Sequence, residues 1–169
     1  MKYRIISDTH FWHQMLIDIW DRDIWFEKRI HKWLMSIPKE DTLIHLWDIL
    51  IWDDKNKHDK YIKSLQCKKI LVKWNHDTKS TSRYYDNWRD FVVDSFVLNH
   101  LWKEIMFVHI PTQETEIRAL QKESRIVIHW HYHKYWRTDR LMKIKHILYS
   151  CEYENMQVRR LDYMVSKIV

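Results

Sequence analysis

Apolar and polar residues alternate in the first half of the chain in short runs that predict strands and helices in turn. Buried-type strands are expected at residues 3–7 (YRIIS), 42–46 (TLIHL) and 68–73 (KKILVK). Helices are expected at 26–37 and 58–65, where apolar residues recur at helical spacing. This alternation predicts an α/β fold whose sheet is parallel in part.

The second half of the chain is richer in strand patterns, with one helix expected near residues 113–122. The strand-like runs are 91–99, 104–110, 125–130, 145–150 and 157–165. No linker or repeat divides the two halves. We therefore predict one domain over residues 1–169, with two packed sheets and flanking helices.

Composition narrows the setting in which the protein works. No apolar stretch approaches the roughly 20 residues of a membrane span, and the N-terminus becomes polar too early for a signal peptide. Cys67 and Cys151 form no paired motif, which favours free thiols in a cytoplasmic protein with no membrane contact. The net charge of +6 comes from scattered residues, so it indicates an anionic partner only weakly, and a generic solvated surface explains it about as well.

Glycine and tryptophan usage is unusual. The chain has no glycine, where average usage of about 7% predicts about 12, and it has 11 tryptophans. Trp88 follows Asn87, and Trp102 lies between two apolar runs that predict a hairpin, and both are positions that normally favour glycine. Trp33, inside a predicted helix, is the one that looks like an ordinary core aromatic. We interpret the tryptophans as standing where a parent sequence had glycine.

Side chains able to bind metal recur at the carboxyl ends of the predicted strands, the edge where open α/β sheets bind ligands. Oxygen and imidazole donors without thiolates favour Mn, Fe, Zn or similar ions. Two such ions about 3.5–4 Å apart can hold a hydroxide nucleophile and clamp a phosphate. A histidine without a metal role is then free to protonate the leaving oxygen. These side chains are Asp8 and His10, Asp48, Asn75 and His76, His109, His131 and His133.

With tryptophan read as glycine, five blocks in this order resemble the calcineurin-like metallophosphoesterase superfamily. They are Asp8-Thr9-His10 (D-x-H), Trp47-Asp48 (G-D), Trp74-Asn75-His76-Asp77 (G-N-H-[DE]), His109 in FVHIP, and Trp130-His131-Tyr132-His133 (G-H-x-H). Each block alone is weak evidence for this superfamily, but the ordered set is highly specific for it. The set spans residues 8–133. The resemblance implies an αββα-type sandwich of two mixed sheets flanked by helices.

The resemblance also implies a role for each block residue in a dinuclear phosphodiesterase that uses a metal-bridging hydroxide. His76 would be the leaving-group acid, and Asp77 would support its loop. The implied cofactors are two divalent ions, manganese first, with iron, zinc, nickel and magnesium as alternatives. One ion would be held by Asp8, His10, Asp48 and His133, and the other by Asp48, Asn75, His109 and His131, with Asp48 bridging.

Two features depart from the family pattern. In the protein Ser/Thr phosphatases of this superfamily the G-D block continues into an Asp-Arg-Gly run, whereas Ile49-Leu50-Ile51-Trp52 follows here. This argues against a protein phosphatase and makes the chain more similar to small prokaryotic or phage-type phosphodiesterases. Tryptophans at 47, 74 and 130 add large rings and restrict φ beneath the metal ligands, so we expect the chain as written to fold poorly, not to assemble its metal site and to be inactive. The predicted function is that of a glycine-bearing parent.

Other readings of the sequence stay open. The chain is alternatively a non-catalytic metal-binding or scaffold member of the same fold, or an aromatic and basic module that binds nucleic acid without metal. For an enzyme, the expected substrate is a phosphoester, with nucleotides and nucleic-acid diesters among the candidates. The sequence predicts no oligomeric state. For His13 and His129, which flank the motifs, we expect a structural role, with substrate contact as the alternative. The remaining histidines are expected at the surface or in the core: His31, His45, His58, His100 and His146.

Overall fold

Two mixed β-sheets and a small number of helices make up the described part of the chain. The computed structural model describes residues 1–11, 13–18, 22–46, 61–73, 90–108, 125–129, 146–148 and 156–167. The α/β class predicted from the sequence is confirmed at this level, with two sheets that each combine parallel and antiparallel pairs.

The first sheet has the strand order β4-β3-β2-β1-β9. Its strands are β1 (Tyr3–Ser7), β2 (Thr42–Leu46), β3 (Lys68–Val72), β4 (Phe91–Val93) and β9 (Arg159–Arg160). All neighbours in it are parallel except β9, which is antiparallel to β1. Ser7 is aligned with Leu46 and Leu46 with Val72, so the three central strands end at one edge of the sheet.

The second sheet has the order β5-β6-β7-β8. Its strands are β5 (Ser95–His100), β6 (Lys103–Val108), β7 (Arg125–His129) and β8 (His146–Leu148). β5 and β6 form an antiparallel hairpin, while β6, β7 and β8 are parallel. Val108 is aligned with His129, so β6 and β7 also end together.

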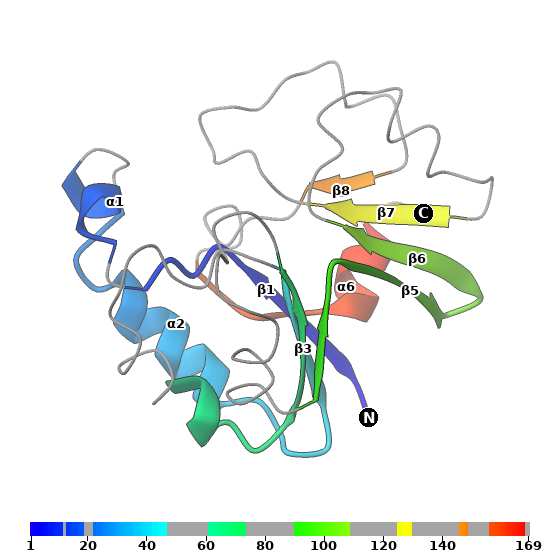
Figure 1. Cartoon of the computed structure of the whole chain (residues 1–169), viewed down its shortest axis with the longest axis horizontal. Coiled ribbons are helices and arrows are strands. Elements are labelled where there is room, and N and C mark those ends of the chain that lie inside the picture. Colours follow the sequence, from blue (N-terminus) through cyan, green and yellow to red (C-terminus); the bar gives the residue numbers. More distant parts are fainter. Residues whose placement is uncertain are drawn as a thin grey trace.

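The two faces of the first sheet are buried against different partners. Ile6 of β1 belongs to a core cluster with Ile30 of helix α2 (Phe26–Met35), whereas Ile5 shares the other cluster with Ile128 of the second sheet. Figure 1 shows this arrangement, with α2 on one side of β1 and β3 and the strands β5 and β6 on the other. Alternation along β1 sends successive side chains to opposite faces, which explains why the strand is buried on both sides.

Helices account for two differences from the sequence-based expectations. The chain forms α1 (Gln14–Asp18), which was not predicted, and residues 61–64 are helical within the range expected at 58–65. The strand expected over 157–165 is wrong beyond β9, because α6 (Leu161–Ser166) follows. Leu161, Met164 and Val165 are buried at helical i, i+3, i+4 spacing. No helix within the described ranges is long and apolar enough to cross a membrane.

The single strand expected over 91–99 is also wrong. The run is divided at Asp94, since β4 pairs with β3 of the first sheet and β5 pairs with β6 of the second. Asp94 is held by an ion pair with Lys73, at 3.0 Å between Oδ1 and Nζ. The expected helix near 113–122 lies outside the described residues. Cys67 is a buried free thiol, as expected, and burial raises its pKa; Cys151 lies outside the described ranges.

The hairpin turn between β5 and β6 places Trp102 in a backbone conformation that favours glycine. Leu101 and Trp102 have φ of 49° and 61°, and the flanking residues His100 and Lys103 are paired. Positive φ at both central residues is the pattern of a type I′ turn. The Trp102 side chain is fully exposed, so it gains no burial in return. The interpretation of this position as a glycine site is therefore supported by its geometry.

The other two described tryptophans lie on or beside α2. Trp33 is 39% exposed, so the prediction of a core aromatic is wrong. The buried side of α2 is instead formed by Phe26, Ile30 and Leu34, which leaves Trp33 next to that stripe. Trp25 is the residue before the helix and is also exposed. The tryptophans at 47, 74 and 130 lie outside the described residues.

Candidate metal-binding edge

The candidate site begins where β1 ends. Asp8 directly follows Ser7, the last residue of β1, and the parallel neighbours β2 and β3 end at the same edge. In Figure 1, β1, β6 and β7 all run toward the left of the view, so both sheets direct carboxyl ends to that side. Strand ends of this kind gather side chains that are distant in sequence.

Asp8 and His10 form a buried pair at this edge. Asp8 is fully buried and His10 is 2% exposed, and Nε2 of His10 lies 3.7 Å from Oδ1 of Asp8. The ring of His13 lies beside that of His10, with 5.6 Å between centroids. A buried carboxylate costs free energy unless positive charge or hydrogen-bond donors compensate it. A protonated His10 or a cation held by both side chains would supply that charge.

The backbone at this pair is strained. Asp8 has a φ of 50° and His10 a φ of 42°, both in the left-handed region. A non-glycine residue there costs of the order of 1–3 kcal/mol, and such residues cluster at functional sites. The strain persists only where the surroundings hold it. Here the neighbours of the 8–10 segment supply that support.

The side chain of Arg22 holds the 8–10 segment by hydrogen bonds to the backbone of that segment. Its Nη2 donates to the carbonyl oxygen of Asp8 at 2.8 Å, and its Nη1 donates to that of Thr9 at 3.2 Å. Arg22 is 3% exposed, and its guanidinium carbon lies 4.9 Å from the centre of the Phe26 ring. The two donors of one planar group thus fix two successive carbonyls.

His45 of β2 supports the segment from the sheet. Its Nε2 lies 3.1 Å from Oγ1 of Thr9, and both residues are fully buried. Burial lowers the pKa of His45 to about 3, so the ring is neutral at physiological pH. Of the surface and core positions predicted for His45, the structure shows the core position. A neutral imidazole is suited to a fixed hydrogen bond rather than to a charge change.

The remaining predicted site residues lie outside the described residues: Asp48, Asn75, His76, Asp77, His109, His131 and His133. In sequence, they follow the ends of β2, β3, β6 and β7. His129, which precedes the last pair, is fully buried at the end of β7. Within the described part of the chain, no three His, Cys, Asp or Glu side chains come close enough to hold a metal ion.

Sequence reasoning missed Arg22. It lies in the run WDRDIW, which matches no motif and has no helical or strand period. Thr9 also had no role predicted from the sequence, because it is the variable residue of a D-x-H block. Both act through backbone or hydroxyl contacts, which leave little trace in a sequence pattern. The buried position of His45 within the apolar run TLIHL was the one available signal.

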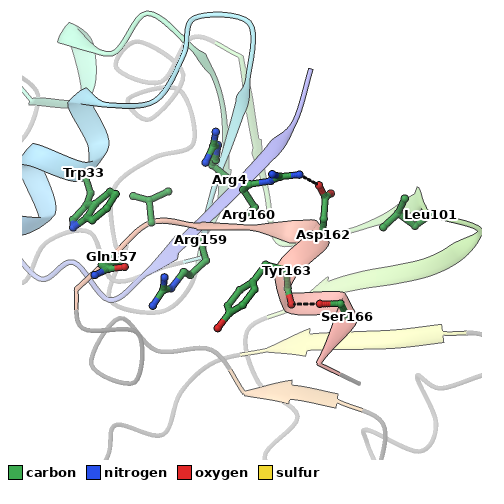
Figure 2. Close-up of a pocket in the computed structure, with 10 residues that line it drawn as sticks. Arg4, Trp33, Leu101, Gln157, Arg159, Arg160, Asp162, Tyr163 and Ser166 are labelled. Carbon is green, nitrogen blue, oxygen red and sulfur yellow. Dashed lines mark hydrogen bonds and ion pairs between the residues drawn. The ribbon is translucent and has the colours of Figure 1, made fainter. Parts of the chain in front are cut away.

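A cavity of about 700 Å³ lies at a different part of the first sheet, beside Arg4 and β9. Figure 2 shows Arg160 paired with Asp162 in its wall, and Asp162 also contacts His100, at 2.7 Å. Arg4 is likewise paired with a carboxylate, at 2.9 Å from Asp41. The cavity is separate from the Asp8 edge, because Arg4 is near the start of β1 and Asp8 follows its end. Its cations Arg4 and Arg160 already pair with carboxylates.

A second cavity, of about 560 Å³, lies on the outer surface of α2. It is lined by Trp25, Lys28, Arg29, His31 and Lys32. The ammonium of Lys28 lies 5.4 Å from the centre of the Trp25 ring. An aromatic ring among cations is the lining that an anionic, base-stacking ligand would require.

Comparison with known proteins gives similarity in structure rather than in sequence. No protein-family model and no curated protein matches the chain. The structure is similar to that of a protein of unknown function from Aquifex aeolicus, with a TM-score of 0.79, 26% sequence identity and 99% of each chain covered. It is also similar to a novel archaeal phosphodiesterase, with a TM-score of 0.57 and 18% identity, over 95% of this chain and 99% of the other. These similarities support an α/β fold for the chain.

Proposed function

We propose that this protein is a phosphodiesterase of the metallophosphoesterase type, with a dinuclear metal site at the carboxyl edge of its sheets. The observation that carries the proposal is the buried Asp8–His10 pair, which directly follows β1 in a strained backbone segment. A carboxylate and an imidazole are donors that Mn, Fe and Zn accept. Their burial at a shared strand edge fits the first two ligands of such a site.

The fold supports the same proposal. The first sheet has α2 against one face, and on the other it shares a core with the second sheet. The helix predicted near 113–122, which lies outside the described residues, would complete an αββα sandwich in one domain. The likeness to an archaeal phosphodiesterase supports this arrangement at the level of fold.

In this proposal the metal ligands are Asp8, His10, Asp48, Asn75, His109, His131 and His133. Two divalent ions, with manganese expected first, would supply a water of lowered pKa and a clamp for the phosphate oxygens. His76 protonates the departing alcohol oxygen, and Asp77 supports the loop that carries His76. Arg22, Thr9 and His45 keep Asp8 and His10 together.

The leaving group provides the test of the assigned acid. We expect the protein with Mn²⁺ to cleave both a dinucleotide and bis(p-nitrophenyl) phosphate. His76→Asn should slow dinucleotide cleavage by roughly 10²–10⁴-fold, because an alkoxide needs a proton, and should affect the nitrophenyl diester much less. His100→Asn, at the far end of β5, is the matched control. Equal losses on both substrates would contradict the acid role of His76.

A non-catalytic member of the same fold makes a different prediction. A scaffold member would bind Mn²⁺ poorly and a metal-binding member would bind it, but neither would cleave either diester. The same result is expected for the variant with glycine at 47, 74 and 130. Hydrolysis by the glycine variant alone would show that the tryptophans limit an otherwise competent site. Assays of the native chain and of the glycine variant therefore distinguish a catalytic protein from a non-catalytic one.

The basic surface of α2 favours a second candidate function, binding of single-stranded nucleic acid. Lys28, Lys32 and Trp25 line the same cavity, and cations beside an aromatic ring suit a phosphate chain with stacked bases. This candidate predicts oligonucleotide binding that needs no metal and weakens steeply with salt. Lys28→Gln with Lys32→Gln should abolish it. Unchanged binding in that variant would exclude this surface.

A further inference from the structure

The segment from Asp8 to His10 has a backbone conformation that its surroundings must hold. Both residues have positive φ, which turns the backbone at two positions separated only by Thr9. In this conformation Nε2 of His10 lies 3.7 Å from Oδ1 of Asp8. If the backbone relaxed to ordinary φ values, the directions of the two side chains would change. The support is thus part of the site's geometry.

Arg22 provides that support from the α2 side. Its guanidinium donates hydrogen bonds to the carbonyl oxygens of Asp8 and Thr9, at 2.8 and 3.2 Å. The group is buried and rests on the ring of Phe26, so its own position is fixed. Hydrogen bonds from a charged donor are stronger than neutral ones, and Arg offers two in a rigid plane.

His45 provides a second support from the sheet. Its contact with the Thr9 hydroxyl joins the segment to β2, the strand parallel to β1. Thr9 is therefore held twice, through its carbonyl by Arg22 and through its side chain by His45. The residue between the two candidate ligands is thus held by contacts from two different elements.

We propose that Arg22 is a positioning residue of the metal site, acting together with His45 through Thr9 to hold Asp8 and His10 in ligand geometry. This inference rests on the proposed function, because it assigns Asp8 and His10 to a metal ion. Partners outside the ligand set commonly change metal affinity by 10–100-fold when they are replaced.

Binding of Mn²⁺, followed by the electron paramagnetic resonance signal of the free ion, tests the proposal. Arg22→Met removes both donors and should weaken binding by 10–100-fold, whereas Arg22→Lys keeps a charged donor and should restore part of the affinity. Thr9→Val, which replaces the hydroxyl with a methyl group and keeps the Thr9 carbonyl, should weaken binding less than Arg22→Met. Arg160→Met is the matched control, since Arg160 is exposed and pairs with Asp162, away from the Asp8 edge. Wild-type affinity in Arg22→Met would overturn the proposal.

Amide hydrogen exchange of the metal-free protein separates this inference from the proposed function. Arg22→Met should speed exchange in residues 8–11 while leaving β3 protected, at a temperature where both proteins are folded. If the wild type binds no Mn²⁺, the proposed function fails, and the exchange data alone decide whether Arg22 holds the segment. Unchanged exchange in residues 8–11 would overturn the inference, as would exchange that rises equally throughout. Should Arg22→Met not fold, Arg22→Lys and Thr9→Val provide the same comparison.

Discussion

Nε2 of His10 lies 3.7 Å from Oδ1 of Asp8, and both side chains are buried at the end of the first parallel strand. The two residues are separated by a single position, and each has a φ that non-glycine residues rarely adopt. A buried acid and imidazole in a strained segment are costly to maintain. That cost indicates a functional constraint at this point of the fold.

Replacement of Asp8 should remove the stabilisation that metal gives the protein. Asp8→Asn keeps the side-chain shape but removes the charge that a metal ion would contact, so added Mn²⁺ should no longer raise the free energy of unfolding. Urea denaturation with and without Mn²⁺ measures this effect. Asp94→Asn, at a side chain that is 84% exposed, is the control.

Trp102 and Trp33 should respond oppositely to replacement by glycine. Trp102→Gly relieves a positive φ at an exposed turn and should raise stability by about 1 kcal/mol. Trp33→Gly introduces glycine into the interior of α2 and should lower stability by about 1 kcal/mol. Thermal unfolding of the two variants provides the comparison. A loss of stability in Trp102→Gly would show that the ring makes a compensating contact.

His45 should remain neutral across the physiological pH range. Burial lowers its pKa in the folded protein to about 3, whereas an unfolded histidine titrates near 6.5. Below pH 6.5 the unfolded chain binds a proton that the folded protein does not, so stability should fall as the pH is lowered toward 3. In NMR spectra the His45 ring should show no titration between pH 5 and 8. A midpoint near 6.5 would mean that the ring is hydrated.

Asp41 should contribute to stability above about pH 4. Burial raises its pKa, but hydrogen bonds from the Arg4 side chain and the Lys2 amide outweigh this and hold the pKa below the usual value. An acid with a depressed folded pKa stabilises the protein above its unfolded pKa of about 3.9, and this contribution is lost as the pH falls through the folded pKa.

Asp41→Asn should therefore reduce stability at pH 7 by about 1 kcal/mol, since the exposed part of Arg4 weakens the pair. The difference from wild type should shrink as the pH falls below 4. Denaturation at pH 7 and pH 3 measures both values. A difference that stays constant between these pH values would exclude the charge of Asp41 as its cause.

The strands that carry the candidate site were predictable because their patterns are unambiguous. The runs at 3–7, 42–46 and 68–73 are short, apolar and bounded by polar residues, and the structure forms strands there. The run at 157–165 was ambiguous, since Leu161, Met164 and Val165 fit a helix as well as a buried strand. Tertiary packing decided between them.

The site could be predicted only as far as side-chain types recur in a recognisable order. Asp8 and His10 follow a strand and form a D-x-H block, so both were identified from the sequence. Arg22 acts on carbonyl oxygens, which every residue possesses, so nothing in the sequence of its partners indicated the contact. The strained φ values at Asp8 and His10 depend on packing and likewise have no sequence signature.

Native mass spectrometry after exchange into Mn²⁺ tests the central claim most directly. We predict two bound ions per chain, with tighter binding in the variant that has glycine at 47, 74 and 130, and loss of bound metal in Asp8→Asn. Absence of bound Mn²⁺ from both the native chain and the glycine variant would contradict a dinuclear site at this edge. Retention of both ions by Asp8→Asn would equally contradict the role of Asp8.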